Sequence, residues 1–196
     1  MAEVFLRRLS RWQAEQQREA IADVYVESYE GDPGAEYRDR QGFLRNFENA
    51  VQRTDFDMVV ADAVGMIGCL YGYRAARTGE WWKGFRGVLP SEVEESTAAG
   101  RVFILTELMV VPAYRRRGVS ERLRTLLLVR HSTDLVVSVI KRDDDLGREV
   151  LRSWGWTKLG EFDRSETGST TPPRRGETET AGPDGLVWEG WMRPMP

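Results

Sequence analysis

One segment near the middle of the chain constrains the fold more than any other. Residues 102–111 are almost continuously apolar, interrupted only by Thr106 and Glu107, as expected of a strand that is covered on both faces of its sheet. Pro112 ends this run, three arginines follow at 115–117, and leucines then recur at helical spacing up to residue 127. The segment therefore predicts a buried strand that passes through a short turn into a helix.

The turn in this segment has the features of an anion-binding site. The first backbone N–H groups of a helix have no intrahelical acceptor and carry partial positive charge. Gly118, at the expected start of the helix, has no Cβ to keep a ligand away from the backbone. Arginines at 115–117 add charge that can reach phosphate oxygens. We therefore expect an anion such as a pyrophosphate to bind here.

At this point the chain resembles the GNAT superfamily of N-acetyltransferases. The family signature is an Arg or Gln, two residues, a Gly, one residue, and then Gly or Ala, often after a strand that ends in Val-x-Pro. Here Arg115-Arg116-Arg117-Gly118-Val119-Ser120 follows Val110-Val111-Pro112. Ser120 departs from the pattern, but Ser is small enough for the site to tolerate it.

The resemblance implies that acetyl-CoA is the cosubstrate. The backbone N–H groups from Arg115 to Ser120 would hold the pyrophosphate, and the end of the strand would pair with the pantetheine arm. The family also has a bulge in this strand. The residues expected to bind coenzyme A are Leu108, Met109, Val110, Arg115, Arg116, Arg117, Gly118, Val119 and Ser120.

The rest of the sequence predicts an α/β fold, with elements in the order β-α-α-β-β-β-α-β-α-β-β. This order fits the GNAT-like architecture, a mixed, mostly antiparallel twisted sheet of about seven strands flanked by four main helices. We expect a single acetyltransferase domain over residues 1–196, with a mobile loop at 164–185 that is rich in Ser, Thr, Gly and Pro. Predicted helices cover about 11–29, 37–53, 119–127 and 144–154, and a short helix could cover 90–99. Ser10 and Gln13 have the spacing of a capping box at the start of the first helix, and Gly155 can end the last one. Predicted strands cover 4–6, 57–61, 66–74, 102–111, 135–140, 156–162 and 186–193, with 62–65 as the turn of a hairpin.

Glu107 is the leading candidate for a catalytic base. An acidic residue in a strand built for burial is costly unless it is paired or faces a cleft, and desolvation would raise its pKa towards a useful range. Attack of an amine on a thioester needs a neutral nitrogen, so a base can accelerate the reaction. The alternatives are that Glu107 is paired with an arginine or only orients the ammonium group of the acceptor.

A general acid for the leaving thiolate is harder to find. Family members often carry a Tyr four residues before the Gly-Phe that follows the last main helix, but Leu151 stands at that position here. Tyr71, Tyr73 and Tyr114 are possible substitutes, although each also fits a packing role. The missing Tyr keeps open a second function, a non-catalytic regulatory module that binds acyl-CoA.

Three other features have a structural and a functional interpretation. Asp143-Asp144-Asp145 would attract a cationic amine or, as we prefer, complement a helix N-terminus. Trp81 and Trp82 would wall the acceptor pocket or fix their own loop. His131, the one histidine, follows a predicted helix, where the helix dipole would favour a cation.

Composition limits the compartment and the partners. A net charge of −3 argues against nucleic acid as a partner, and no apolar run is long enough to span a membrane. Cys69 is the only cysteine, so no internal disulfide can form, and with one histidine no metal site is expected. We expect a cytoplasmic protein.

The sequence thus predicts a GNAT-type N-acetyltransferase that transfers the acetyl group of acetyl-CoA to a primary amine of a small molecule or peptide. A larger acyl donor is an alternative within the same chemistry. Exposed edge strands and Trp188 and Trp191 near the C-terminus would suit a homodimer. The sequence names no particular acceptor, because loops set it in this fold.

Overall fold

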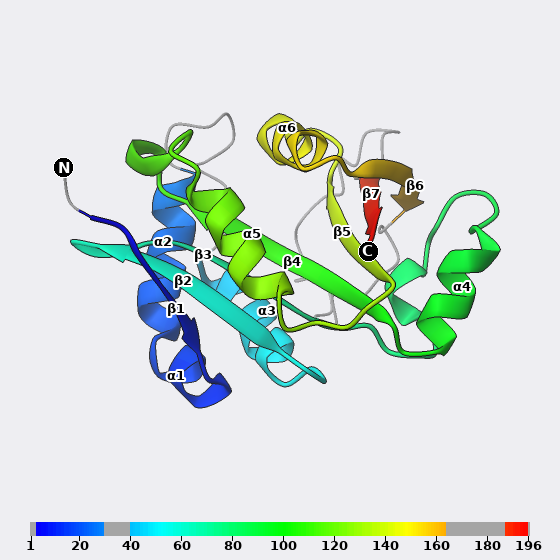
Figure 1. Cartoon of the computed structure of the whole chain (residues 1–196), viewed down its shortest axis with the longest axis horizontal. Coiled ribbons are helices and arrows are strands. Elements are labelled where there is room, and N and C mark those ends of the chain that lie inside the picture. The colour runs from blue at the N-terminus through cyan, green and yellow to red at the C-terminus, as the bar shows by residue number, and fades with distance from the viewer. Residues whose placement is uncertain (1–2, 30–39, 164–186, 196) are drawn as a thin grey trace, which may run out of the picture. The chain divides into compact units, whose positions relative to one another are not determined.

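The computed structural model of the 196-residue chain describes residues 3–29, 40–163 and 187–195 (Figure 1). The chain forms two compact units, of which the first comprises Met1–Arg74 and Phe103–Thr133 and the second Ala75–Val102 and Asp134–Pro196. The mobile loop predicted at 164–185 lies outside the described residues. That residues 1–196 form a single acetyltransferase domain stays a prediction.

The first unit contains four antiparallel strands in the order β1-β2-β3-β4. The predicted hairpin is confirmed, with a tight turn in which Gly65 has a φ of 96°, a left-handed conformation that favours glycine. The strands are β1 (Phe5–Leu9), β2 (Asp57–Ala63), β3 (Gly65–Arg74) and β4 (Val102–Val110).

Two sets of helices cover opposite faces of these strands. Neighbouring residues of a strand point to opposite faces. Arg8 of β1 donates to the Leu126 carbonyl near the end of α5, whereas Arg7 donates to Gln17 between α1 and α2 (3.0 Å). The helix α5 therefore lies on one face, and the N-terminal helices lie on the other. The helices of this unit are α1 (Arg11–Gln16), α2 (Arg18–Ser28), α3 (Arg40–Val51) and α5 (Val119–Leu128).

The N-terminal helical segment begins as predicted but is divided. Ser10 and Gln13 form a reciprocal capping box at the start of α1, because each side chain accepts from the backbone N–H of the other. The single helix predicted over about 11–29 is wrong, since Gln17 leaves helical geometry (φ −99°, ψ 10°) and separates α1 from α2. Hydrophobic periodicity continues across Gln17, and so it does not reveal the break.

The fourth strand contains the bulge that the resemblance implies. Tyr71 pairs with Glu107 and Gly72 pairs with Leu105, so Thr106 is an extra residue without a partner on β3. A Cβ added at Gly72 would lie 2.1 Å from the Ile104 carbonyl oxygen. Glycine at this position therefore allows the two backbones to approach at the irregularity.

The second unit contains three antiparallel strands in the order β5-β7-β6. The Asp144 side chain accepts from the Gly147 N–H (2.8 Å) and caps α6, and Gly155 follows this helix with a φ of 75°. These elements are α4 (Ser91–Ala98), β5 (Leu135–Lys141), α6 (Asp145–Ser153), β6 (Thr157–Asp163) and β7 (Val187–Pro194).

The predicted α/β class and the mixed, mostly antiparallel sheet of seven strands are confirmed. The described residues contain six α-helices where four main helices were predicted, because the first helix is divided and a short helix, α4, precedes β4. None of the helices in the described ranges is long and apolar enough to cross a membrane.

Candidate active site

The turn after β4 has an unusual backbone. Pro112 opens a short 3-10 helix that ends at Tyr114, as its fixed φ allows. Arg116 then has a φ of 57° and Gly118 a φ of 72°. A left-handed conformation at a non-glycine residue costs of order 1 kcal/mol or more, and such residues cluster at functional sites. The turn between β4 and α5 therefore stores strain at the position where the sequence predicts an anion site.

The start of α5 is open. Gly118 is the N-cap residue and provides no side-chain hydrogen bond, and a Cβ added to it would meet no atom of the described residues within 4 Å. Within the described part of the chain, the backbone N–H groups of Arg116 and Gly118 donate to no backbone carbonyl. Val119 is buried, which fixes the helix on the sheet, while Ser120 is half-buried. This end of α5 can thus accept an anion without a change in packing.

The three arginines of the turn have different surroundings. Arg115 is half-buried and donates from Nε to the Val110 carbonyl (3.1 Å) and from its terminal nitrogen to the Ser28 carbonyl. Arg116 and Arg117 are exposed, and the Arg117 guanidinium lies over the Tyr114 ring (5.2 Å). Arg115 therefore holds protein backbone, whereas Arg116 and Arg117 are exposed, as the predicted phosphate contacts require.

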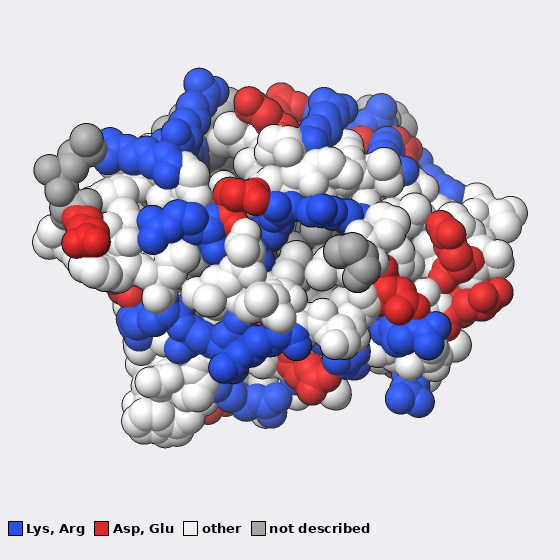
Figure 2. Space-filling view, viewed as in Figure 1, with Lys and Arg blue, Asp and Glu red and all other residues white. Residues whose placement is uncertain are grey.

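Basic side chains are abundant around α5. Figure 2 shows Lys and Arg side chains in several groups on the face that carries α5 in Figure 1, with Asp and Glu side chains among them. Arg122 in α5 and Arg130 just after it are exposed, as are Arg116 and Arg117 of the turn. Such a surface can attract a polyanionic ligand even though the chain as a whole is slightly acidic.

The end of β4 presents the other predicted coenzyme contacts. Leu108 and Val110 are partly exposed, whereas the Met109 side chain is buried. All three pair with β3: Leu108 lies opposite Leu70, Met109 opposite Cys69 and Val110 opposite Gly68. Alternate residues of an antiparallel strand direct their backbone groups to opposite edges, so some groups here point away from β3. Any contact of Met109 with a ligand would have to use its backbone.

Glu107 lies on the face of β4 that the N-terminal helices cover. Its Oε1 accepts a hydrogen bond from the hydroxyl group of Tyr29 (2.9 Å), directly after α2. Tyr71, its partner in register on β3, is buried against Phe47 of α3. Sequence reasoning missed Tyr29 because 78 positions separate it from Glu107 and it follows the end of the helical pattern.

The negative charge of Glu107 affects two other groups on β3. Burial raises the pKa of the Tyr71 hydroxyl well above its ordinary value, and Glu107 raises it further. Burial and the same carboxylate also raise the pKa of the Cys69 thiol. Both groups therefore stay protonated at neutral pH, so neither is a ready nucleophile.

The candidates for a general acid fare differently. Leu151 is buried in α6 and has no proton to donate. Of the proposed substitutes, Tyr71 is protonated and lies opposite Glu107, whereas Tyr73 and Tyr114 lie beside arginines at ring distances of 5.7 and 5.2 Å. Tyr71 is thus the tyrosine nearest in register to the candidate base.

Asp144 and Trp81 have structural roles, which were one of the two interpretations that the sequence allowed for each. Asp144 caps α6, as described above. Trp81 donates from Nε1 to the Thr97 hydroxyl (3.2 Å) and packs near Phe162, at a ring distance of 6.4 Å. These contacts within the second unit fix the loop that carries Trp81. Among the described residues, no group of three or more His, Cys, Asp or Glu is arranged to hold a metal ion.

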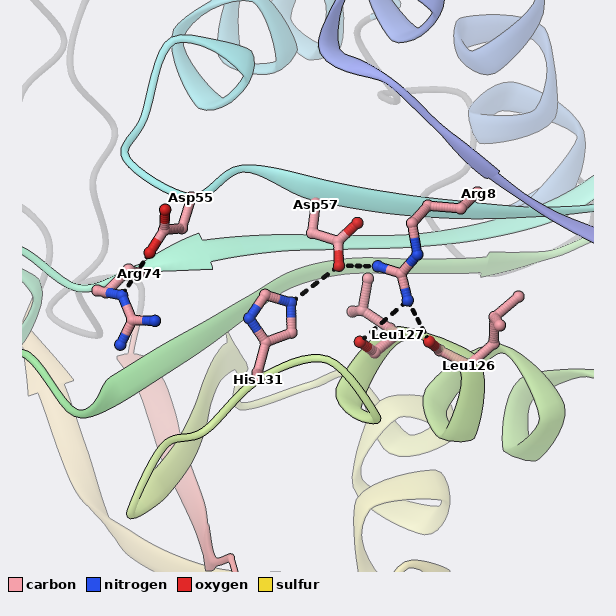
Figure 3. Close-up of polar contacts among 7 residues, drawn as sticks. All are labelled: Arg8, Asp55, Asp57, Arg74, Leu126, Leu127 and His131. Carbon is pink, nitrogen blue, oxygen red and sulfur yellow. Dashed lines mark hydrogen bonds and ion pairs between the residues drawn. The ribbon is translucent and has the colours of Figure 1, made fainter.

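His131 belongs to a polar cluster at the other end of α5 (Figure 3). Its Nε2 lies 2.8 Å from Oδ2 of Asp57, which also accepts from Arg8. Burial and the positive charges of Arg8 and Arg74 lower the pKa of His131 to about 4, although the charge of Asp55 alone would raise it. The expectation of a protonated His131 is therefore wrong, because Arg8 already neutralises Asp57 and a neutral imidazole ring can donate its N–H to the same carboxylate.

Comparison with known proteins finds similarity in the fold alone. No protein-family model and no curated protein matches the sequence. Solved structures with matching folds include an N-acetyltransferase, PaiA, from Thermoplasma acidophilum in complex with coenzyme A (14% identity, 98% of this chain and 99% of the other, TM-score 0.56). A GNAT-family acetyltransferase from Staphylococcus aureus matches with 12% identity over 98% and 99% of the two chains, at a TM-score of 0.58.

The chain has the GNAT acetyltransferase fold. A third similar structure is the NatC complex bound to Gag peptide and coenzyme A, which matches over 99% of both chains with 12% identity and a TM-score of 0.56. The resemblance drawn from residues 110–120 is thereby confirmed at the level of fold. At identities of 12–14% these likenesses leave the residues of the site to be argued from this chain alone.

Proposed function

We propose that this protein is an N-acetyltransferase that transfers the acetyl group of acetyl-CoA to a primary amine of a small molecule or peptide. The observation that carries the proposal is the open, strained turn at the start of α5, in a chain with the GNAT fold. Two of the similar structures contain coenzyme A, which supports the same ligand here.

The residues of the turn fit a pyrophosphate. The N–H groups of Arg116 and Gly118 donate to no backbone carbonyl in the part of the chain that the structure describes. Together with the first N–H groups of α5 and the exposed Arg116 and Arg117, they offer donors and positive charge. The empty space above Gly118 would admit the ligand. Partly exposed Leu108 and Val110 would contact the pantetheine arm.

Glu107 supplies the base in this proposal. The acceptor reaches the site as an ammonium ion and must lose a proton before its nitrogen can attack the carbonyl carbon of the thioester. Glu107 takes this proton, directly or through water, and passes it to solvent. As the neutral nitrogen then forms the new C–N bond and the C–S bond breaks, the nitrogen loses its second proton to solvent, and the thiolate of coenzyme A takes a proton from solvent or an acid. A carboxylate held by Tyr29 and paired in register with Tyr71, whose ring packs against Phe47 of α3, suits an ammonium ligand.

Release of free thiol from acetyl-CoA in the presence of a panel of amines tests this function. With the best acceptor, Glu107→Gln should lower kcat at least tenfold, because the amide cannot take the proton. Glu94→Gln, at an exposed position of α4, is the matched control and should leave kcat unchanged. Wild-type kcat in Glu107→Gln at every pH would remove Glu107 from this role.

The buried Leu151 favours one alternative, a regulatory module that binds acyl-CoA without turnover. Tight binding of acetyl-CoA together with no thiol release for any amine would support that module. Comparison of acetyl-, propionyl- and succinyl-CoA in the same assay would identify a larger donor, as the other alternative requires.

A further inference from the structure

The side chain of Arg115 joins two elements that carry the candidate active site. Its Nε donates to the carbonyl of Val110, the last residue of β4, and its terminal nitrogen donates to the carbonyl of Ser28, the last residue of α2. Both contacts are partly buried. A planar guanidinium can reach two acceptors in fixed directions, which an ammonium group cannot do. Arg115 therefore fixes the end of α2 relative to the end of β4.

Tyr29 follows directly after the residue that Arg115 holds. Its hydroxyl group donates to Oε1 of Glu107, and its ring packs edge-on against Tyr25 (5.2 Å). Tyr25 in turn stacks on Phe43 of α3, with the ring centroids 4.4 Å apart. The hydroxyl group is thus located by backbone contacts on one side and by aromatic packing on the other.

From these contacts we propose that Arg115 and Tyr29 are positioning residues for Glu107. Arg115 holds the end of α2, and Tyr29 then fixes the orientation of the carboxylate through one of its oxygens. The inference rests on the proposed function in that Glu107 is taken as the base. It assigns Arg115 to the acceptor side of the reaction, instead of to the phosphates that its place in the motif suggests.

The hydrogen bond has a chemical consequence as well as a geometric one. A donor to a carboxylate stabilises the charged form and lowers its pKa. The groups that face Glu107 from the described elements are Tyr29 after α2 and Tyr71 and Cys69 on β3, of which the last two are protonated at neutral pH. Removal of the Tyr29 hydroxyl should therefore raise the pKa of Glu107. A loss of ring packing that leaves the hydroxyl donor in place should not raise it.

The decisive variant is Tyr29→Phe, which keeps the ring. We expect kcat to fall about tenfold, the apparent pKa of the acidic limb of kcat/KM to rise by about one unit, and the Kd for acetyl-CoA to stay within twofold. Ser91→Ala removes a hydroxyl group from an exposed position of α4 and should change none of these quantities. Wild-type kcat and an unshifted pH profile in Tyr29→Phe would overturn the proposal.

Arg115→Lys separates positioning from phosphate binding. Lysine keeps the charge but cannot hold both carbonyls, so kcat should fall about tenfold while the Kd for acetyl-CoA changes less than threefold. A large loss of acetyl-CoA affinity with normal kcat at saturation would return Arg115 to the phosphates and contradict the proposal. Circular dichroism and the thermal midpoint check that each variant is folded.

A measurement without turnover distinguishes failure of this inference from failure of the proposed function. Carbon-13 NMR of the Glu107 carboxyl group, assigned with Glu107→Gln, gives its pKa in the wild type and in Tyr29→Phe. If no amine is acetylated but the pKa of Glu107 still rises in Tyr29→Phe, the contact holds and the proposed function fails. An unchanged pKa would overturn the inference whatever the activity.

Discussion

The two ends of α5 differ in almost every respect. At its N-terminus, Gly118 and Arg116 adopt left-handed backbone conformations, and no side chain from residues 3–29, 40–163 or 187–195 caps the helix or fills the space above Gly118. At its C-terminus, Arg8 donates to the Leu126 and Leu127 carbonyls and pairs with Asp57 (Figure 3). The N-terminal end is thus strained and open, whereas at the C-terminal end the Arg8 side chain satisfies backbone carbonyls of the helix. We call these the open end and the closed end.

This difference shows where the helix gains stability and where that stability is used. Helix termini leave backbone groups unsatisfied, and proteins normally satisfy them with side chains. Here Arg8 does so at the C-terminal end, in a cluster that is mostly shielded from solvent. The anchored end allows the open end to keep its donors for a ligand, so mutations at the two ends should have separable effects.

The largest effect is expected from Gly118→Trp at the open end. The new side chain would occupy the space above the helix start, and acetyl-CoA affinity should fall at least 1,000-fold, or about 4 kcal/mol, as measured by calorimetry. Gly87→Trp places the same side chain on another left-handed glycine with free space around it and should bind acetyl-CoA normally. Normal affinity in a folded Gly118→Trp would mean that the coenzyme does not use this turn.

At the closed end, Asp57→Asn should lower stability and leave coenzyme binding intact. The substitution leaves Arg8 partly buried without its charged partner, so the free energy of unfolding should fall by about 3 kcal/mol in urea titrations. The acetyl-CoA affinity of the folded protein should stay within twofold. Asp55→Asn, which breaks the more exposed pair with Arg74, should cost less than about 1 kcal/mol. A Kd that worsens in step with stability would contradict the separation of the two ends.

The smallest effect is expected from the protonation of His131 at low pH. His131 has a pKa of about 4 in the folded chain against 6.5 when unfolded, so the unfolded chain binds more protons between these values. Stability should therefore fall as the pH drops, by about 2 kcal/mol from this group between pH 7 and pH 5, with no contribution above pH 7. His131→Gln should remove this part of the slope in urea titrations at several pH values. Parallel slopes in the two proteins would show that the ring is already protonated in the folded state.

Much of the fold could be predicted from sequence because its signals are local. The capping box at Ser10 and Gln13, the hairpin around Gly65 and the glycine after α6 all depend on residues close in the chain. The turn between β4 and α5 could also be predicted in this way, since a proline, three arginines and a glycine stand within seven positions of one another. Such features need no knowledge of the tertiary structure.

The contacts that organise the candidate site could not be predicted, because they join distant segments. Tyr29 reaches Glu107 across 78 positions, and Arg115 reaches Ser28 across 87. Within the motif, sequence gives the three arginines equal standing, yet the structure directs Arg115 to backbone carbonyls. His131 likewise lost its expected charge through neighbours that only the folded chain brings together.

Thr106 determines which face of β4 carries Glu107, through its place in the backbone and not through its side chain. Leu105 pairs with Gly72, on the same face as Phe103, whose ring stacks on His131 after α5. Because of the extra residue, Glu107 lies on the opposite face, although a regular strand would place residues 105 and 107 on the same one. The face that carries the carboxylate therefore depends on whether an odd or an even number of residues precedes it in the strand. A regular strand with the same residues would exchange the two surfaces beyond Leu105 and turn the acid towards α5, whereas deletion of Thr106 would remove the bulge and leave Glu107 opposite Tyr71.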